Sequence, residues 1–366
     1  MKFSLLSCSL AAFGLTMAPA LAGAPAKELA PAEVSRRTWF PDDPAGSFTL
    51  GGLFSEHLTG VYLDSITGLW APEDRDAFLF LNSRYHYEDD GQFISSTGLG
   101  FRKLWPEREV IVGGNVFYDS LHSAFDNDFQ QLGLGVEVLT RWVDARFNYY
   151  LPDNDQYEIG RSTTRDSERS LSSEFVSNGF INRDLSEISR TRSFKRYEAA
   201  LEGWNGEIGF LIPGLDRYAE VRLYGGYYHY DNPFGSDFEG FKARLEARVL
   251  PGLIADLEYW NDEELMGGHW TAGVRVTVPF SIAKLVTGRN PFEGIGEYFT
   301  PRRREFRERM GDMVMRSHRL QTTTSGDLPA GDSSTSETTT LPIRPVPKPA
   351  PPRRVSGGGG DGFPPE

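Results

Sequence analysis

Cysteine is almost missing from this sequence, which contains one, Cys8, among 366 residues. The six histidines are scattered, and no Cys-x-x-Cys or His-x-x-x-His pair occurs, so the chain lacks the spacing of a zinc site. No Gly-x-Ser-x-Gly motif occurs either, and the Gly-x-Gly pairs lie within expected strands with no helix following. We therefore expect no catalytic residues, no cofactor and no metal, and predict that the protein is not an enzyme.

Long apolar runs are also missing beyond the N-terminus. A membrane-spanning helix needs about 20 apolar residues, so the sequence excludes a helical membrane protein but not a β-barrel, whose strands hide their apolar face in alternation. The net charge of -13 repels phosphate backbones, and no dense basic patch runs through residues 47–280. We expect no nucleic-acid partner.

The N-terminus predicts a secretory signal peptide over residues 1–22. Lys2 is followed by an apolar stretch up to Met17 and by the small-x-small sequence Ala20-Leu21-Ala22. Cleavage there would remove the cysteine, and residues 23–46 would form a short periplasmic lead-in.

Residues 47–280 divide into about twelve segments of strand length, separated by Pro, Gly, Asp and Asn. In the segment 241–249, every odd position is apolar and every even position is charged. A helix would spread such a period-two pattern around its surface, so it indicates strands.

The links between these segments alternate in length. Short links are expected after every second strand, as at Pro251-Gly252, while several of the other links are longer. Short turns at one end and long loops at the other are typical of outer-membrane barrels. The pattern predicts an all-β fold, a transmembrane antiparallel β-barrel of about 12 strands, and leaves a soluble secreted β-sandwich that binds a ligand as an alternative.

The two faces of the expected strands differ in chemistry. Charged residues of both signs are expected to line a wet lumen and to pair across strands: Arg146, Glu220, Arg222, Lys242, Arg244, Glu246, Arg248, Asp256, Glu258 and Arg275. Aromatic residues near strand ends are expected to form girdles at the membrane interfaces: Trp70, Trp105, Trp142, Tyr149, Tyr150, Tyr227, Tyr228, Tyr230, Tyr259 and Trp260.

Several motifs resemble the translocator barrel of the intimin and invasin family, also called inverse autotransporters. They include 98–102, the Asn-Val-Phe-Tyr-Asp element with its preceding glycines (113–119) and the Gly-Leu-Gly spacing of 132–137. The similarity covers most of 48–280, and 309–317 is similar to the segment that follows the barrel in that family. Its most specific positions are Asn115, Phe117, Tyr118, Asp119, Gly133 and Gly135.

This resemblance implies a twelve-stranded barrel in the bacterial outer membrane, in contact with its lipid and inserted by the barrel assembly machinery. It also implies that residues 281–321 form a linker that threads the lumen and carries the C-terminus outside the cell. The arginines of 302–319 would then meet lumen carboxylates. The alternative is an outer-membrane diffusion pore whose C-terminal segment stays in the periplasm.

Residues 322–366 are rich in Ser and Thr, then Pro, then Gly, which is a linker composition that cannot build a core. We expect a disordered tail there, in place of the immunoglobulin-like or lectin-like domains that family members carry after the barrel. Any host or cell-surface ligand would then be bound by this tail or by outer loops, such as the long loop expected at 152–195. The sequence leaves the ligand and the oligomeric state open.

Overall fold

The computed structural model describes residues 45–55, 59–176, 180–262, 267–293, 295–317 and 319–345. The predicted signal peptide, almost all of the lead-in and the chain beyond 345 lie outside the described residues. Contacts divide the chain into two units. The first unit contains the residues up to Tyr157 and Tyr197–Ser325. The second unit contains Glu158–Arg196 and the chain from Gly326 onward.

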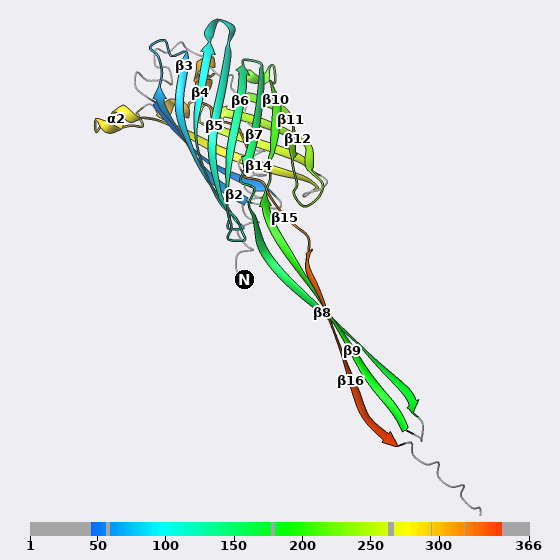
Figure 1. The fold of residues 1–366 in the computed structure, drawn as a ribbon. Coiled ribbons are helices and arrows are strands. Elements are labelled where there is room, and N and C mark those ends of the chain that lie inside the picture. The colour runs from blue at the N-terminus through cyan, green and yellow to red at the C-terminus, as the bar shows by residue number, and fades with distance from the viewer. Residues whose placement is uncertain are drawn as a thin grey trace, which may run out of the picture. The chain divides into compact units, whose positions relative to one another are not determined.

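The first unit is a closed antiparallel barrel of twelve strands (Figure 1). Its strands are β1 (Ala45–Ser55), β2 (Thr59–Trp70), β3 (Ala77–Glu88), β4 (Phe93–Trp105), β5 (Val110–His122), β6 (Asp128–Thr140), β7 (Val143–Pro152), β10 (Gly203–Leu211), β11 (Glu220–Tyr230), β12 (Phe238–Leu250), β13 (Leu253–Asp262) and β14 (Gly267–Ser281). Pairing of β1 with β14, from Ala45 opposite Ser281 to Ser55 opposite Thr271, closes the ring. The predicted fold class is confirmed, and the first strand begins two residues before the predicted boundary.

Burial alternates along these strands, as the period-two pattern requires. In β6, each residue from Phe129 to Leu139 at an odd position is buried and each at an even position is exposed. The exposed face carries large apolar side chains such as Leu134 and Val136, while buried polar and charged side chains line the other face. The barrel therefore has an apolar outside, and its inside carries many polar and charged side chains beside apolar ones.

The links between barrel strands also follow the predicted alternation. Residues 71–76, 106–109, 141–142, 212–219 and 251–252 join strands at one end, which we call the short-turn end. The 3-10 helices η1 (Pro106–Arg108) and η2 (Leu215–Arg217) lie in two of these links.

The aromatic prediction is right for some residues and wrong for others. Trp70, Trp105 and Trp142 are exposed on the outer face near the short-turn end. Tyr150, Tyr228 and Tyr230 are instead buried, and Trp260 packs against their cluster. Adjacent residues of a strand point to opposite faces, so Tyr149 and Tyr150 cannot both lie in one outer girdle.

The region expected to be a long loop forms two strands, β8 (Gln156–Val176) and β9 (Phe180–Ala200), which pair with each other. Strand β16 (Leu328–Pro345) pairs antiparallel with β9, whereas composition predicted no structure from Thr322 onward. Thr-rich sequence has high strand propensity, and the edge of β9 supplies the backbone partners that an isolated linker lacks. Side chains of β8 from Arg161 to Glu174 are exposed, so this stretch of the strand buries no apolar side chain.

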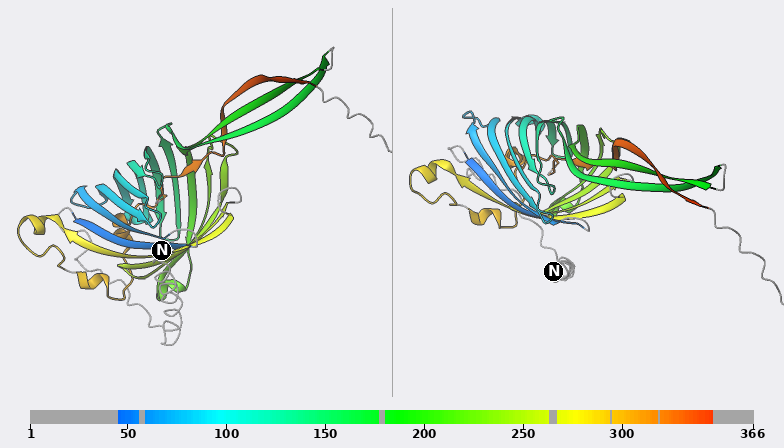
Figure 2. Two further views of the ribbon diagram at one scale, coloured as in Figure 1. Left: turned by 90° about the horizontal axis from the view of Figure 1, so that it is seen from below. Right: turned by 60° about the horizontal axis from the view of Figure 1, so that its bottom comes forward.

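After β14 the chain forms two short helices, α2 (Ile282–Val286) and α3 (Ile295–Tyr298), the 3-10 helix η3 (Phe306–Gly311) and strand β15 (Thr322–Thr324). No helix among the described residues is both long enough and apolar enough to span a membrane. Figure 2 shows the orange segment that follows α3 among the strands of the barrel. We call residues 302–321 the lumen segment, because the contacts described next place it inside the ring.

Candidate functional site

The inner wall of the barrel is built from alternating charges on neighbouring strands. Arg146 Nη1 lies 2.9 Å from Glu207 Oε1, Arg244 Nη2 lies 2.7 Å from the same oxygen, and Arg275 Nη2 lies 2.5 Å from Glu246 Oε2. Lys242 and Asp256 join this network through Glu207 and Arg275. Cross-strand pairing explains how so many charges share one narrow lumen.

The remaining predicted lumen residues divide into two groups. Glu220, Arg222 and Arg248 lie toward the short-turn end, where Glu220 pairs with Arg222 and Arg304, and Arg248 pairs with Asp312. Glu258 is half-buried beside the same lumen, and the described residues supply no ion pair to it. The predicted set therefore lies along the inner wall of β7 and β11 to β14.

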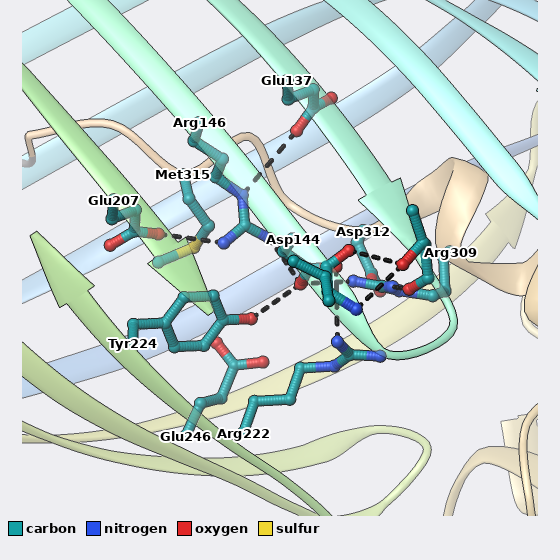
Figure 3. A network of polar contacts seen from close by, with 12 residues as sticks. Glu137, Asp144, Arg146, Glu207, Arg222, Tyr224, Glu246, Arg309, Asp312 and Met315 are labelled. Carbon is teal, nitrogen blue, oxygen red and sulfur yellow. Dashed lines mark hydrogen bonds and ion pairs between the residues drawn. The ribbon is translucent and has the colours of Figure 1, made fainter. Parts of the chain in front are cut away.

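Asp144, at the start of β7, is the centre of this network although the sequence analysis missed it (Figure 3). Its side chain is fully buried, and its Oδ2 accepts hydrogen bonds from Tyr224 Oη at 2.9 Å and Arg309 Nη2 at 2.7 Å. Arg222 Nη1 lies 3.3 Å from Oδ1 and Arg146 Nη2 3.6 Å from Oδ2. One carboxylate thus connects three wall side chains to the lumen segment.

Wall side chains also hold the backbone of the lumen segment. Arg102 donates from Nη1 to the carbonyl oxygens of Met310 at 2.8 Å and Asp312 at 2.6 Å, while its Nε donates to Glu137 at 2.6 Å. Arg84 Nη2 donates to the carbonyl of Val314 at 2.8 Å. These bonds hold the backbone of the segment against the wall.

Two apolar side chains of the lumen segment are buried in a cluster on the wall. Met310 and Val314 pack with residues of β2 to β6: Ile66, Phe78, Phe80, Leu104, Ile111, Phe117 and Leu139. Burying a side chain of this size stabilises by about 1.5 to 3 kcal/mol. The segment is therefore bound by apolar packing as well as by charge.

Separate cavities remain around the lumen segment inside the barrel. A cavity of about 380 Å³ lies near Arg141 and Arg303 toward the short-turn end, and one of about 330 Å³ lies near Glu88 and Trp260. A third cavity, of about 30 Å³, is lined by Arg146 and Met315 together with Pro251 and Tyr298, so it reaches from the β12–β13 link toward the middle of the wall. Arg309, Asp312 and Met315 of the lumen segment contribute to its lining, so the segment takes up part of the lumen there.

The family-motif residues lie at one place on β5 and β6. Asn115, Phe117 and Asp119 face the lumen, and Tyr118 is exposed on the outer face. Gly135 gives room to Asn115 and Asn148, because a Cβ on it would lie 2.5 Å from Asn115 Oδ1. Gly133 gives similar room to Arg316.

The wall residues that the sequence analysis missed, Asp144, Glu137 and Glu207 among them, occupy the same alternating positions as those it found. Once the apolar residues of a strand are assigned to the outer face, the alternate residues must face the lumen, and this rule predicts the missed carboxylates. The pairing of wall residues with the lumen segment has no such signal, because it depends on the path of that segment.

The described residues contain one group with metal-ligand geometry, His229, Asp231 and Asp237 near the link between β11 and β12. Asp231 Oδ1 lies 3.0 Å from His229 Nε2, and Asp237 Oδ1 accepts a hydrogen bond from the backbone of Asn232. These contacts within the link explain why the three side chains lie close together.

The family comparison decides the identity of the barrel. Residues 54–230 match the model of the inverse autotransporter β-domain. This barrel is an inverse autotransporter β-domain. The protein is accordingly a bacterial outer-membrane β-barrel of the translocator type, and the resemblance found in the sequence is confirmed.

One solved structure supports the barrel fold of this β-domain, and two others are similar over part of the chain. A structure from a study of the in-meso crystallization of membrane proteins is 14% identical, covers 77% of this chain and 100% of its own, and has a TM-score of 0.53. The β-domain of the Bordetella autotransporter BrkA is 12% identical over 64% of this chain and 98% of its own, with a TM-score of 0.22. CdiB from Acinetobacter baumannii is 8% identical, covers 65% of this chain and 60% of its own, and has a TM-score of 0.30. The search of curated proteins found no match.

The outer face of the β-domain offers a test of its membrane contact. Leu134, at the middle of β6, has an exposed outward side chain, so an arginine there would lie near the bilayer midplane. We expect Leu134→Arg to lower the free energy of unfolding in lipid by about 2–4 kcal/mol. Gln130→Arg, on the same face near the strand end, should cost less than about 1 kcal/mol. Urea titrations in vesicles measure both, and equal costs would place the bilayer elsewhere.

Proposed function

We propose that the β-domain anchors the chain in the outer membrane, translocates its own C-terminal part through the lumen and displays the tail from Thr322 at the cell surface. The work is transport and anchoring, without enzymatic activity or a cofactor. The observation that carries the proposal is the lumen segment, whose Arg304, Arg309 and Arg316 each form an ion pair with a wall carboxylate. A periplasmic segment would have no need of partners spread along the lumen.

The lumen segment itself favours this function over a diffusion pore. A pore needs a continuous aqueous path, whereas Met310 and Val314 of the segment are buried against the wall, and Arg309 and Arg316 pair with wall carboxylates inside the ring. Segment and wall are matched in charge, which fits a chain that stays in the barrel after export.

Adhesion is the second part of the proposal, and the second unit supports it. The sheet of β8, β9 and β16 is rich in exposed Ser, Thr, Arg and Glu, and side chains of this kind give a polar surface for hydrogen-bonding partners. We propose that this sheet and the tail contact a host or cell-surface ligand, while outer-membrane lipid and the barrel assembly machinery are the partners of the barrel.

The test is protease shaving of intact cells that express the full chain with an epitope tag after Glu366. Loss of the tag from undamaged cells is the expected result, because export places the C-terminus outside. A second tag in the short-turn link at 71–76 is the matched control and should survive until the outer membrane is opened. A C-terminal tag that is protected until that point would contradict export and favour a periplasmic tail.

A further inference from the structure

Asp119 differs from most buried carboxylates of the wall in its partners, and only Glu88, 3.6 Å from Arg319, resembles it among the described residues. Asp64, Glu137, Asp144, Glu207 and Glu246 each pair with an arginine of the wall itself. Among the described residues, the ion-pair partner of Asp119 is Arg316 of the lumen segment, with no wall arginine beside it. Its charge is balanced only when the segment is in place.

The contact between the two side chains is closely fitted. Arg316 Nη1 and Nη2 lie 2.5 Å from Oδ1 and Oδ2 of Asp119, an arrangement in which the planar guanidinium meets both carboxylate oxygens. Both side chains are about 96% buried, since each exposes 4% of its surface. Breaking such a pair leaves an uncompensated buried charge.

Neighbouring residues shape the wall around the guanidinium. The Arg316 guanidinium carbon lies 4.4 Å from the centre of the Phe117 ring, within range of a cation–π interaction. A Cβ on Gly133 would lie 2.4 Å from Arg316 Nη2, so a side chain there would displace the guanidinium. Tyr150 Oη accepts a hydrogen bond from the backbone N–H of Ser317 at 2.9 Å. We call Asp119, Phe117, Gly133 and Tyr150 the arginine seat.

The sequence that follows Arg316 is also suited to such a seat. From Gln321 to Ile343 it contains neither Arg nor Lys, so no residue of this stretch can form the bidentate contact. Arg319, the one arginine between Arg316 and that stretch, is held differently, with its Nε 3.6 Å from Glu88 Oε2. Beyond this stretch, Arg344, Lys348, Arg353 and Arg354 would reach the seat before Arg316, so the fit of Arg316 must also depend on its neighbours, such as the Ser317 N–H that Tyr150 Oη accepts.

We propose that the arginine seat is the register stop of translocation: Asp119 is a positioning residue that halts the outgoing chain when Arg316 arrives and then holds it there. This inference rests on the proposed function, and it assigns a task to the motif residues Phe117, Asp119 and Gly133. Loss of the seat should leave export possible but let the lumen segment slide.

Disulfide trapping measures the register directly. Ala200 of β9 lies opposite Thr322 of β15 in the strand pairing, so an Ala200→Cys, Thr322→Cys pair reports whether the segment stands in register. The sequence contains no cysteine besides Cys8, so the background is low. In the full chain in outer membranes we expect rapid crosslinking, slowed at least about tenfold by Asp119→Asn or by Arg316→Gln.

Two further variants separate a stop from general stability. The exchange Asp119→Arg with Arg316→Asp should restore much of the crosslinking rate, because it re-forms the ion pair with the charges reversed, whereas a loss of stability unrelated to this pair would persist. Asp128→Asn removes an exposed carboxylate at the end of β6 that pairs with His122, and it should leave the rate unchanged. Heat-dependent migration in detergent gels checks that each barrel is folded. If Asp119→Asn fails to assemble, Arg316→Gln still tests the seat, because it changes the lumen segment and leaves the wall residues as they are.

The outcomes distinguish this inference from the proposed function. A surface-exposed tag with unchanged crosslinking in both Asp119→Asn and Arg316→Gln would overturn the register stop and leave export standing. A tag that stays periplasmic in the unmodified chain would overturn export itself.

Discussion

A chain that ends after Thr300 is expected to form an open pore, whereas the full chain should conduct poorly. Truncation there removes the whole lumen segment but keeps α3, whose Tyr298 is buried beneath the β12–β13 turn and accepts the Gly252 N–H through its carbonyl. The cavities of about 380 and 330 Å³ would then join through a lumen lined by charged side chains. We expect single-channel conductance to rise by roughly an order of magnitude.

The matched control ends after Ser325. It removes the second unit's β16 and everything beyond it, but keeps every contact between the lumen segment and the wall. Its conductance should stay as low as that of the full chain. If both truncations conduct alike, with heat-dependent gel migration showing folded barrels, then the lumen segment does not close the pore.

The barrel was predictable because each strand repeats one local rule. In β12, the alternation from Phe241 to Val249 fixes which residues face inward, and the short link at Pro251-Gly252 fixes where the strand turns. Twelve strands of this kind can close only with partners on both edges, so β1 had to meet β14. Local pattern and closure together gave the fold class and the strand count.

Two features lay beyond such reasoning. The 21-residue strands β8 and β9 carry no alternation, because neither face is apolar, so they were indistinguishable from a loop. The partners of Arg309 and Arg316 depend on the path and register of the lumen segment, which no strand pattern encodes. Asp144 shows the intermediate case, since alternation predicts that it faces inward but not that four side chains converge on it.

Asp144→Asn is expected to cost the barrel more than any other single change of one wall carboxylate. The variant keeps the shape of the side chain but leaves Arg146, Arg222 and Arg309 without the charge that they share. Since Asp144 is fully buried, water cannot replace that charge. Removing one partner of a buried ion pair typically costs 3–5 kcal/mol, so we expect a loss of about that size in the free energy of unfolding.

Two controls define what the charge contributes. Tyr224→Phe removes one hydrogen bond that a neutral donor makes to the Asp144 carboxylate over 2.9 Å, and it should cost about 1.5–3 kcal/mol. Glu258→Gln neutralises a half-buried carboxylate for which the described residues provide no ion pair, and should change stability by less than about 1 kcal/mol. Urea titration followed by heat-dependent gel migration measures all three. Equal stability of Asp144→Asn and Glu258→Gln would mean that the central arginines are already balanced by Glu137, Glu207 and Glu220, and that the lumen segment is held chiefly by Met310 and Val314.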